Sequence, residues 1–289
     1  MDRSFFYSLV ENIYYCAAMQ KNITIHHTQV PALGFGTWEL NGQECRHSVS
    51  EALNSGYRHI DTAEMYGNEA WVGQGIKDSG IARHDVFLTT KIWYTNLSRQ
   101  AVAHSLEQSL QKLQTSYVDL LLIHWPNPDI PLSETVGAMV ELQKQGKVKH
   151  VGVSNFTTRL LKEALQYAPV FCNQVEYHPF LSQQKLRDLC KANQVLLTAY
   201  CPIAKGAVNE HPVLQKIAQN HGKSPVQVTL KWFMQQDVSA IPKASSARHR
   251  NSNFDIFDFE LSPPEMQAIF NLAQGKRLVN PAHAPEWDQ

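Results

Sequence analysis

The chain has 289 residues, 43% of them apolar, and its 26 Lys and Arg side chains balance 26 Asp and Glu side chains. This composition can bury a large core, but the balanced charge creates no field that attracts nucleic acid or an anionic membrane surface. A local cluster of charge could still hold a small anionic ligand. No apolar run reaches the length of a membrane span.

The cysteine pattern argues against cross-links and metal sites. The chain contains Cys16, Cys45, Cys172, Cys190 and Cys201. Their odd number and the lack of C-x-x-C spacing disfavour a disulfide framework and a structural zinc site. None of the 13 His residues forms an H-E-x-x-H motif. We therefore expect no metal ion and a reducing, cytoplasmic compartment.

The N-terminal residues 1–18 loosely imitate a signal peptide, with a basic residue, an apolar patch and small residues near the end. Glu11 and Asn12 interrupt the apolar run, which argues against secretion. Met19 precedes a segment that already alternates as a strand would. We expect residues 1–18 to be a disordered extension, or the product of a mis-set start codon, and residues 19–289 to form a single domain.

From residue 33 onwards, strand and helix patterns alternate along the chain. A small hairpin comes first, with residues 23–25 and 30–32 as its strands and residues 26–29 as its turn. Eight predicted strands follow, and several are the near-continuous apolar runs typical of buried parallel strands: 33–38, 57–61, 86–91, 118–124, 148–155, 170–177, 195–201 and 238–242. The predicted helices are 43–55, 69–79, 98–113, 133–145, 158–167, 183–193, 211–220, 225–235, 247–253 and 263–273.

Eight such strands with helical crossovers predict an α/β fold, a (β/α)8 TIM barrel whose bottom the N-terminal hairpin closes. The alternative is an open doubly wound sheet, which usually carries G-x-G-x-x-G after its first strand. Here the run Leu33-Gly34-Phe35-Gly36-Thr37-Trp38 lacks the third glycine, so that reading is weak. No low-complexity linker divides the chain.

Chemically capable side chains stand at the ends of the predicted strands, where the active site of such a barrel gathers. They are Trp38, Asp61, Lys91 with Trp93, His124 with Trp125, Ser154 with Asn155, Gln174 with Glu176, Tyr200 and Lys243. Tyr66 follows Asp61 by five residues, and a phenol near a carboxylate indicates proton-transfer chemistry. Each residue alone has a structural explanation, but together they predict one site at one mouth.

Several of these residues lie in motifs that resemble the aldo-keto reductase family. The motifs are Gly56–Glu69, Lys91 after two threonines, Leu-Leu-Ile-His124-Trp125-Pro126, Gly152-Val153-Ser154-Asn155-Phe156, Asn173-Gln174-Val175-Glu176 and Ile241-Pro242-Lys243. They occur in the family's order from about Val30 to the C-terminus. The chain most resembles compact bacterial members of the 2,5-diketo-D-gluconate reductase and methylglyoxal reductase type.

The resemblance implies a catalytic tetrad of Asp61, Tyr66, Lys91 and His124, and NADPH-dependent reduction of aldehydes and ketones, including dicarbonyls and keto-sugars, to alcohols. Hydride transfer to a carbonyl generates an alkoxide, so Tyr66 would supply a proton. We expect the Lys91 ammonium to lower the pKa of Tyr66 and Asp61 to keep that lysine charged. His124 would orient the carbonyl towards the nicotinamide.

The resemblance also implies the cofactor contacts, which are Thr37, Trp38, Ser154, Asn155, Gln174, Tyr200, Cys201, Lys243, Ser245, Ser246, Arg248 and Asn253. Tyr200 would stack on the nicotinamide, and the residues around Lys243 would grip the 2′-phosphate, favouring NADPH over NADH. The family usually has an Arg six residues after this Lys, where the chain has His249. Arg248 is a neighbouring substitute that can contact phosphate bidentately.

The expected substrate pocket is lined by Trp38, Tyr66, Trp93, His124 and Trp125, because aromatic walls suit a small carbonyl compound. Short loops after residues 126 and 202 and a brief tail after Arg277 suggest an open site. We expect a monomer whose partner is a small carbonyl substrate. The alternatives are a non-enzymatic nicotinamide sensor or regulatory subunit, a storage protein on the same scaffold, and an NAD-preferring polyol dehydrogenase.

Overall fold

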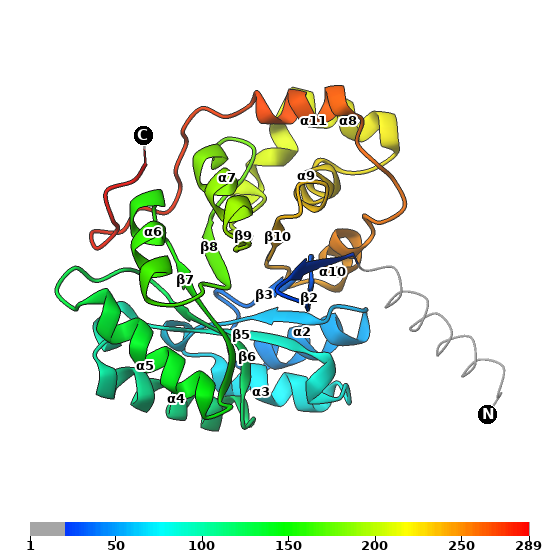
Figure 1. Ribbon diagram of the computed structural model, residues 1–289. Helices are drawn as coiled ribbons and strands as arrows, with labels where there is room; N and C mark the ends of the chain where they lie inside the picture. Colours follow the sequence, from blue (N-terminus) through cyan, green and yellow to red (C-terminus); the bar gives the residue numbers. More distant parts are fainter. Residues whose placement is uncertain (1–20, 289) are drawn as a thin grey trace, which may run out of the picture.

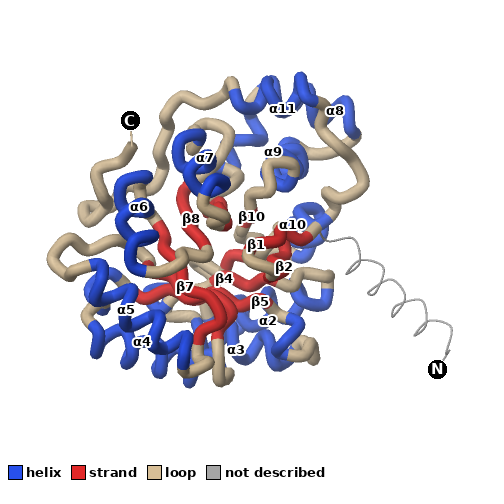
Figure 2. The backbone as a smooth tube through the Cα atoms, in the orientation of Figure 1, coloured by secondary structure: helices blue, strands red, loops and turns tan. Residues whose placement is uncertain are grey.

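The computed structural model describes residues 21–288, so the extension predicted at residues 1–18 lies outside the described part. The strands are β1 Asn22–Ile25, β2 Thr28–Pro31, β3 Phe35–Gly36, β4 His59–Asp61, β5 Phe87–Ile92, β6 Val118–Ile123, β7 Val148–Ser154, β8 Cys172–Glu176, β9 Leu196–Tyr200 and β10 Ser239–Ala240. The tube in Figure 2 shows these strands enclosed by helices and loops.

The α-helices are α2 Gly42–Asn54, α3 Glu69–Asp78, α4 Arg99–Leu113, α5 Leu132–Lys144, α6 Thr158–Tyr167, α7 Gln184–Ala192, α8 Pro212–His221, α9 Pro225–Met234, α10 Ala247–Phe254 and α11 Pro263–Phe270. Four short 3-10 helices, which were not predicted, lie in the loops of residues 21–288: η1 Glu64–Tyr66, η2 Arg83–Asp85, η3 Tyr94–Asn96 and η4 Ala204–Glu210.

Within residues 21–288, eight parallel strands form one curved sheet in the order β3-β4-β5-β6-β7-β8-β9-β10. Its two edges meet where Leu33 pairs with Ala240, and the Gly34 amide donates to the Ala240 carbonyl oxygen at 2.8 Å. The sheet therefore closes on itself, with helices around its outside (Figure 1). The predicted (β/α)8 barrel is confirmed.

Two glycines make this closure possible. A Cβ on Gly36 would lie 2.6 Å from the carbonyl oxygen of Ile241, just after β10, and a Cβ on Gly34 would lie 2.8 Å from Cγ2 of the same residue. Both distances are too short for a side chain, so the first and last strands approach each other only because these positions lack one. The Gly-x-Gly pair thus serves the seam of the barrel and not a dinucleotide-binding turn.

The N-terminal hairpin lies at the bottom of the barrel, as predicted. Its turn consists of His26 and His27, both in the left-handed region with φ of 45° and 66°. Thr28 Oγ1 lies 3.1 Å from Nε2 of His150, early in β7. β2 also borders a cavity together with Phe87, the first residue of β5. β2 begins at Thr28, earlier than expected, because two residues suffice for the turn.

The ends of several elements differ from the predictions. The strands expected at residues 33–38 and 238–242 shrink to two residues each, because seam pairing beyond them consists of an isolated bridge. Gly146 follows α5 with φ of 74°, the left-handed conformation that a glycine commonly adopts just after a helix. Ser98 precedes α4, but its side chain makes no capping bond; Glu134 accepts the Arg99 amide instead, at 2.8 Å.

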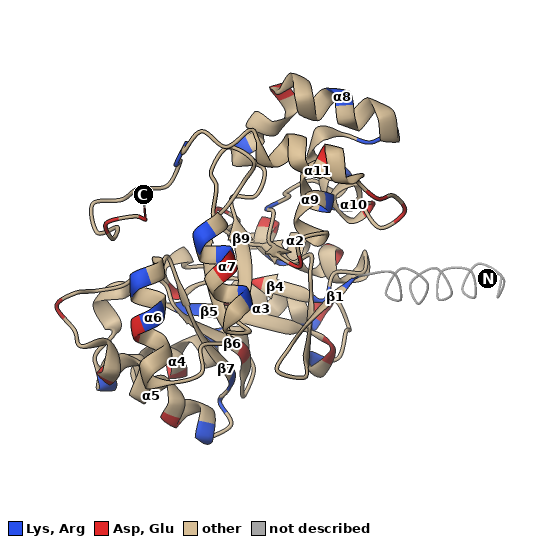
Figure 3. Cartoon of the chain, turned by 45° about the horizontal axis from the view of Figure 1, so that its top comes forward, with Lys and Arg blue, Asp and Glu red and all other residues tan. Residues whose placement is uncertain are grey.

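Charges of both signs alternate on the outer helices, for example along α6 and α7 (Figure 3). In the part of the chain that the structure describes, no helix is long and apolar enough to cross a membrane. Nor do three or more His, Cys, Asp or Glu side chains of that part gather closely enough to hold a metal ion.

Candidate active site

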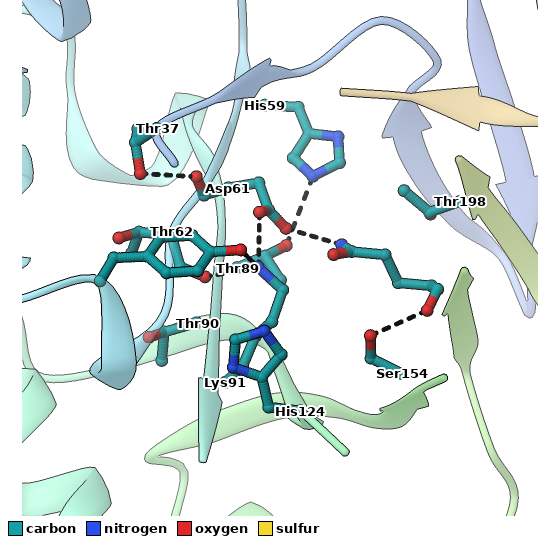
Figure 4. Close-up of polar contacts among 12 residues, drawn as sticks. Thr37, His59, Asp61, Thr62, Thr89, Thr90, Lys91, His124, Ser154 and Thr198 are labelled. Carbon is teal, nitrogen blue, oxygen red and sulfur yellow. Dashed lines mark hydrogen bonds and ion pairs between the residues drawn. The ribbon is translucent and has the colours of Figure 1, made fainter. Parts of the chain in front are cut away.

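Asp61 and Lys91 form an ion pair inside the barrel. β4 ends at Asp61, and its pairing with Thr89 places Lys91 two residues further along β5. The Lys91 ammonium Nζ donates to Asp61 Oδ1 at 2.6 Å and to the Thr62 carbonyl oxygen at 2.7 Å (Figure 4). Both side chains are almost fully buried. Burial lowers the pKa of Lys91, and the Asp61 carboxylate opposes that shift.

Tyr66 reaches this ion pair from η1, which ends at the left-handed Gly67. Lys91 Nζ donates to Tyr66 Oη at 3.3 Å, so the phenol hydrogen remains available for another acceptor. Burial holds the pKa of Tyr66 well above its usual value, and the nearby Asp61 carboxylate adds to this effect. In the protein alone the net shift of this pKa is therefore upward, and the lowering by Lys91 that we expected stays a prediction.

His124 follows β6 and packs edge-to-face against Tyr66, with ring centroids 5.6 Å apart. Its carbonyl oxygen accepts a hydrogen bond from Asn155 Nδ2 at 2.9 Å. Burial, with Lys91 and His283, holds the pKa of His124 well below its usual value, so the imidazole is neutral at pH 7. Its buried Nδ1 has no hydrogen-bond partner in residues 21–288. A neutral imidazole can orient a carbonyl oxygen without adding charge.

Gln174 in β8 connects the ion pair to the opposite side of the barrel. The side-chain Nε2 of Gln174 donates to Asp61 Oδ2 at 2.7 Å. The main-chain carbonyl oxygen of Gln174 accepts a hydrogen bond from the Ser154 hydroxyl at 2.8 Å. Asn155 Oδ1 accepts the Tyr200 hydroxyl at 2.8 Å. The structure thus brings these predicted residues together, but it also bonds them to one another. Both oxygens of the Asp61 carboxylate are occupied as a result.

Aromatic rings surround the four residues of the tetrad. The Trp38 ring centroid lies 4.8 Å from that of Tyr66, and the Trp93 centroid lies 5.2 Å from that of His124. Trp38 is 46% exposed, whereas Trp125 is 5% exposed. The three tryptophans therefore lie at the mouth as expected from their strand ends, with Trp125 on its buried side.

The C-terminal segment adds residues to this wall that the sequence did not predict. His283 stacks on Tyr94 with ring centroids 4.3 Å apart, and it meets Trp93 and Trp125 edge-on at 5.3 and 5.2 Å. Trp287 packs 6.1 Å from Trp125. The brief tail thus contributes two side chains, His283 and Trp287, to the wall of the mouth. No local pattern signals these contacts, because their partners are far away along the chain.

Two further polar residues, which were not selected from the sequence, form hydrogen bonds with the backbone of the loops after β3 and β5. Asn68 Nδ2 donates to the carbonyl oxygens of Thr37 and Leu40 at 2.8 and 2.9 Å. Glu64 Oε2 accepts the Trp93 amide at 2.9 Å. Their place in the Gly56–Glu69 motif was the available signal, but their partners are visible only in the folded chain.

Residues 32–274 match the aldo/keto reductase family. The chain is 41% identical over 265 residues to a glyoxal reductase of Bacillus subtilis (strain 168), covering 90% of this chain and 96% of that protein. It is also 41% identical over 265 residues to the methylglyoxal reductase DkgB of Yersinia pestis, covering 90% and 99%. The chain belongs to the aldo/keto reductase family.

Solved structures agree with this assignment. The crystal structure of a candidate 2,5-diketo-D-gluconic acid reductase B matches with a TM-score of 0.92 at 44% identity, covering 96% of this chain and all (100%) of that one. MGS-M4, an aldo-keto reductase from a deep-sea metagenome library, matches with a TM-score of 0.88 at 34% identity, covering 92% and 100%. The protein is thus an oxidoreductase acting on carbonyl groups, in a family that uses nicotinamide cofactors.

In this aldo/keto reductase, the segment expected to hold the adenosine phosphate is exposed. Lys243 and Ser245 lie at the surface just before α10, and Arg248 lies at the surface in its first turn. The Ser246 hydroxyl caps that helix by accepting the His249 amide at 3.2 Å. Exposed cations beside a helix N-terminus fit a phosphate group, which such ends attract through their free amides.

Arg250 is the other arginine beside His249, the position at which the family usually has an arginine. Its side chain faces inward. It is 2% exposed, and its Nη1 donates to the Ser245 carbonyl oxygen at 2.8 Å. Arg250 therefore braces the loop, while Arg248 is the arginine accessible to a ligand. Asn253, predicted as a cofactor contact, is 5% exposed in the same helix.

Thr37 and Cys201 complete the predicted cofactor contacts. Thr37 is fully buried and donates its hydroxyl to the Asp61 carbonyl oxygen at 2.9 Å, so its side chain supports β4. Cys201 follows β9 in a left-handed conformation with φ of 53°, beside Tyr200. Burial raises the pKa of the Cys201 thiol, which disfavours a reactive thiolate there.

Proposed function

We propose that the protein reduces small aldehydes and ketones to alcohols with NADPH, and that Tyr66 donates the proton to the carbonyl oxygen. The observation that carries this proposal is the position of Tyr66 Oη, 3.3 Å from the Lys91 ammonium, at a mouth lined by aromatic rings. Methylglyoxal and keto-sugars such as 2,5-diketo-D-gluconate are the proposed substrates, because similar proteins carry these names.

The tetrad divides the work of proton transfer. Its raised pKa keeps Tyr66 protonated, so the proton is present at physiological pH. As negative charge moves onto the phenol oxygen, the buried Lys91 ammonium stabilises it in surroundings of low dielectric. Asp61 keeps that ammonium charged against the cost of burial. The acid therefore releases its proton only when an alkoxide develops to take it.

The remaining groups position the reactants. His124, neutral and beside Tyr66, orients the carbonyl oxygen by a hydrogen bond. When bound, the nicotinamide cofactor would supply the hydride. Trp38, Trp93 and Trp125 keep water from the reacting carbonyl and limit the size of the compound that enters.

NADPH is the proposed cofactor because Lys243 and Arg248 present two cations on the segment before and within α10. A 2′-phosphate would bind between them, and Arg248 would take the contact that His249 cannot match as a permanent charge. At the nicotinamide end we propose Ser154, Asn155, Gln174 and Tyr200 as contacts. Gln174 uses its Nε2 for Asp61, which leaves its Oε1 for the carboxamide.

The test is NADPH oxidation, followed by absorbance, with methylglyoxal, 2,5-diketogluconate, glyceraldehyde and nitrobenzaldehyde as substrates. We expect turnover of at least one of them and a higher kcat/KM with NADPH than with NADH. NADPH binding without turnover of any would favour the sensor role. A preference for NADH in polyol oxidation would favour the polyol dehydrogenase.

A further inference from the structure

Residues 277–288, here called the C-terminal strap, run across the mouth of the barrel after the last helix. Figure 1 shows this segment passing α7 and ending beside α6. Its first residues bind to one buried carboxylate, that of Glu176 at the end of β8. The Leu278 amide donates to Glu176 Oε1 at 2.6 Å, and the Val279 amide donates to Oε2 at 3.0 Å.

The Glu176 side chain is fully buried, and most of its partners belong to the strap. His178 Nε2 lies 3.0 Å from Oε1, and the Arg277 guanidinium lies 3.6 Å from Oε2. A buried carboxylate is stable only when hydrogen bonds and an opposite charge replace its lost water. With the strap undocked, Glu176 would lose two amides and a cation. The carboxylate and the strap therefore stabilise each other.

The rest of the strap contacts the aromatic wall of the mouth. His283 fills the space among Tyr94, Trp93 and Trp125. Trp287 lies between Trp125 and the Arg277 guanidinium, which stacks 3.6 Å from its ring centroid. These contacts begin four residues after Val279, whose amide Glu176 binds, so the hydrogen bonds to Glu176 limit how far His283 can move from the wall.

The tip of the strap has its own anchor. The Asp288 carboxylate accepts the Thr158 amide at 2.8 Å and the Thr158 hydroxyl at 2.7 Å, at the start of α6. This anchor is exposed and so contributes less than the buried one. The strap is thus held firmly at its beginning and weakly at its end.

We propose that Glu176 is a positioning residue that, by holding the C-terminal strap against Trp93 and Trp125, sets the size of the carbonyl compound that the enzyme prefers. The proposal rests on the proposed reductase function for its substrates. Glu176 acts through His283 and Trp287 and does not touch the reacting atoms.

The test compares Glu176→Gln with Asp119→Asn. Asp119 is also a buried carboxylate that accepts a backbone amide, that of Leu88 at 3.0 Å, but it lies at the start of β6, at the bottom of the barrel. Hydrogen exchange by mass spectrometry reports on the strap, and kcat and KM for methylglyoxal and phenylglyoxal report on the pocket.

In Glu176→Gln we expect faster exchange over residues 277–288 and a KM for methylglyoxal raised about tenfold, with kcat changed less than about threefold. The ratio of kcat/KM for phenylglyoxal to that for methylglyoxal should rise, because the mouth widens. Asp119→Asn should change neither the exchange of the strap nor this ratio, even where it lowers stability.

The proposal is overturned if exchange over residues 277–288 in Glu176→Gln stays at the wild-type rate, or if it rises without a change in the substrate ratio. If Glu176→Gln does not fold, His283→Ala replaces it and should move the ratio in the same direction; an unchanged ratio overturns the proposal as well. A wild-type protein that reduces neither compound would refute the proposed function, whereas the exchange measurement still decides whether Glu176 holds the strap.

Discussion

At the scale of single residues, two opposing influences act on the protonation of Tyr66. Burial favours the neutral phenol, and the neighbouring Lys91 ammonium favours the phenolate. Burial raises the pKa of Tyr66 in the protein alone, so the phenol carries its proton at neutral pH. Tyr66→Phe should therefore keep NADPH affinity within about twofold while kcat falls about 10²- to 10⁴-fold, because only the proton is removed. Steady-state kinetics and NADPH fluorescence titration measure the two quantities.

A matched control exists for this variant. Tyr177 is 2% exposed, and its hydroxyl donates to Gln236 at 2.8 Å, away from the tetrad. Tyr177→Phe should lose a comparable buried hydroxyl and keep kcat. If Tyr66→Phe turns over like the wild type, another residue is the acid.

The pH dependence of kcat depends on Asp61. Its carboxylate raises the pKa of Lys91 against burial and adds to the raised pKa of Tyr66. Asp61→Asn should lower both pKa values, so both groups lose their protons at lower pH and the alkaline limb of kcat moves to lower pH. His124, neutral through its lowered pKa, adds no acidic limb near pH 7. An alkaline limb at the wild-type position in Asp61→Asn would contradict this role.

At the scale of elements, the closing seam between β3 and the segment after β10 leaves no room for a side chain at Gly36. Gly36→Ala places a Cβ against the Ile241 carbonyl oxygen and should lower the free energy of unfolding by about 1–3 kcal/mol. Gly137 in α5 is the control, because its added Cβ would meet nothing closer than Arg99 Nη2 at 3.7 Å. Gly137→Ala should stabilise by up to about 1 kcal/mol. Urea unfolding measures both, and a Gly36→Ala protein as stable as the wild type would refute the tight seam.

At the scale of the whole molecule, buried thiols report whether the barrel opens as one unit. Burial raises the pKa of Cys45 in α2 and of Cys172 in β8 to about 12. Because the thiolate is the reactive form, both should react with iodoacetamide only through unfolding. Their labelling rates, followed by mass spectrometry, should therefore coincide and rise together with urea. Labelling of Cys45 well before Cys172 would show that α2 opens separately.

The sequence by itself determined the barrel and the mouth at which the tetrad gathers. Alternating apolar runs and amphipathic helices are local patterns, and parallel strands necessarily end at one edge of their barrel. Asp61, Lys91 and His124 could therefore be placed together from their positions at strand ends. The order of the motifs was enough to indicate the family, which the comparisons confirmed.

Only the tertiary structure decided how those residues are tuned. The direction of the Tyr66 pKa depends on burial by the whole barrel, and the bond from Gln174 to Asp61 joins β8 to β4 across it. The contact of His283 with Trp93 and Trp125 likewise joins the tail to loops far along the chain. Such effects arise between distant segments, where local sequence patterns carry no information. They set the surroundings of Asp61, Tyr66, Lys91 and His124, which the sequence had already named.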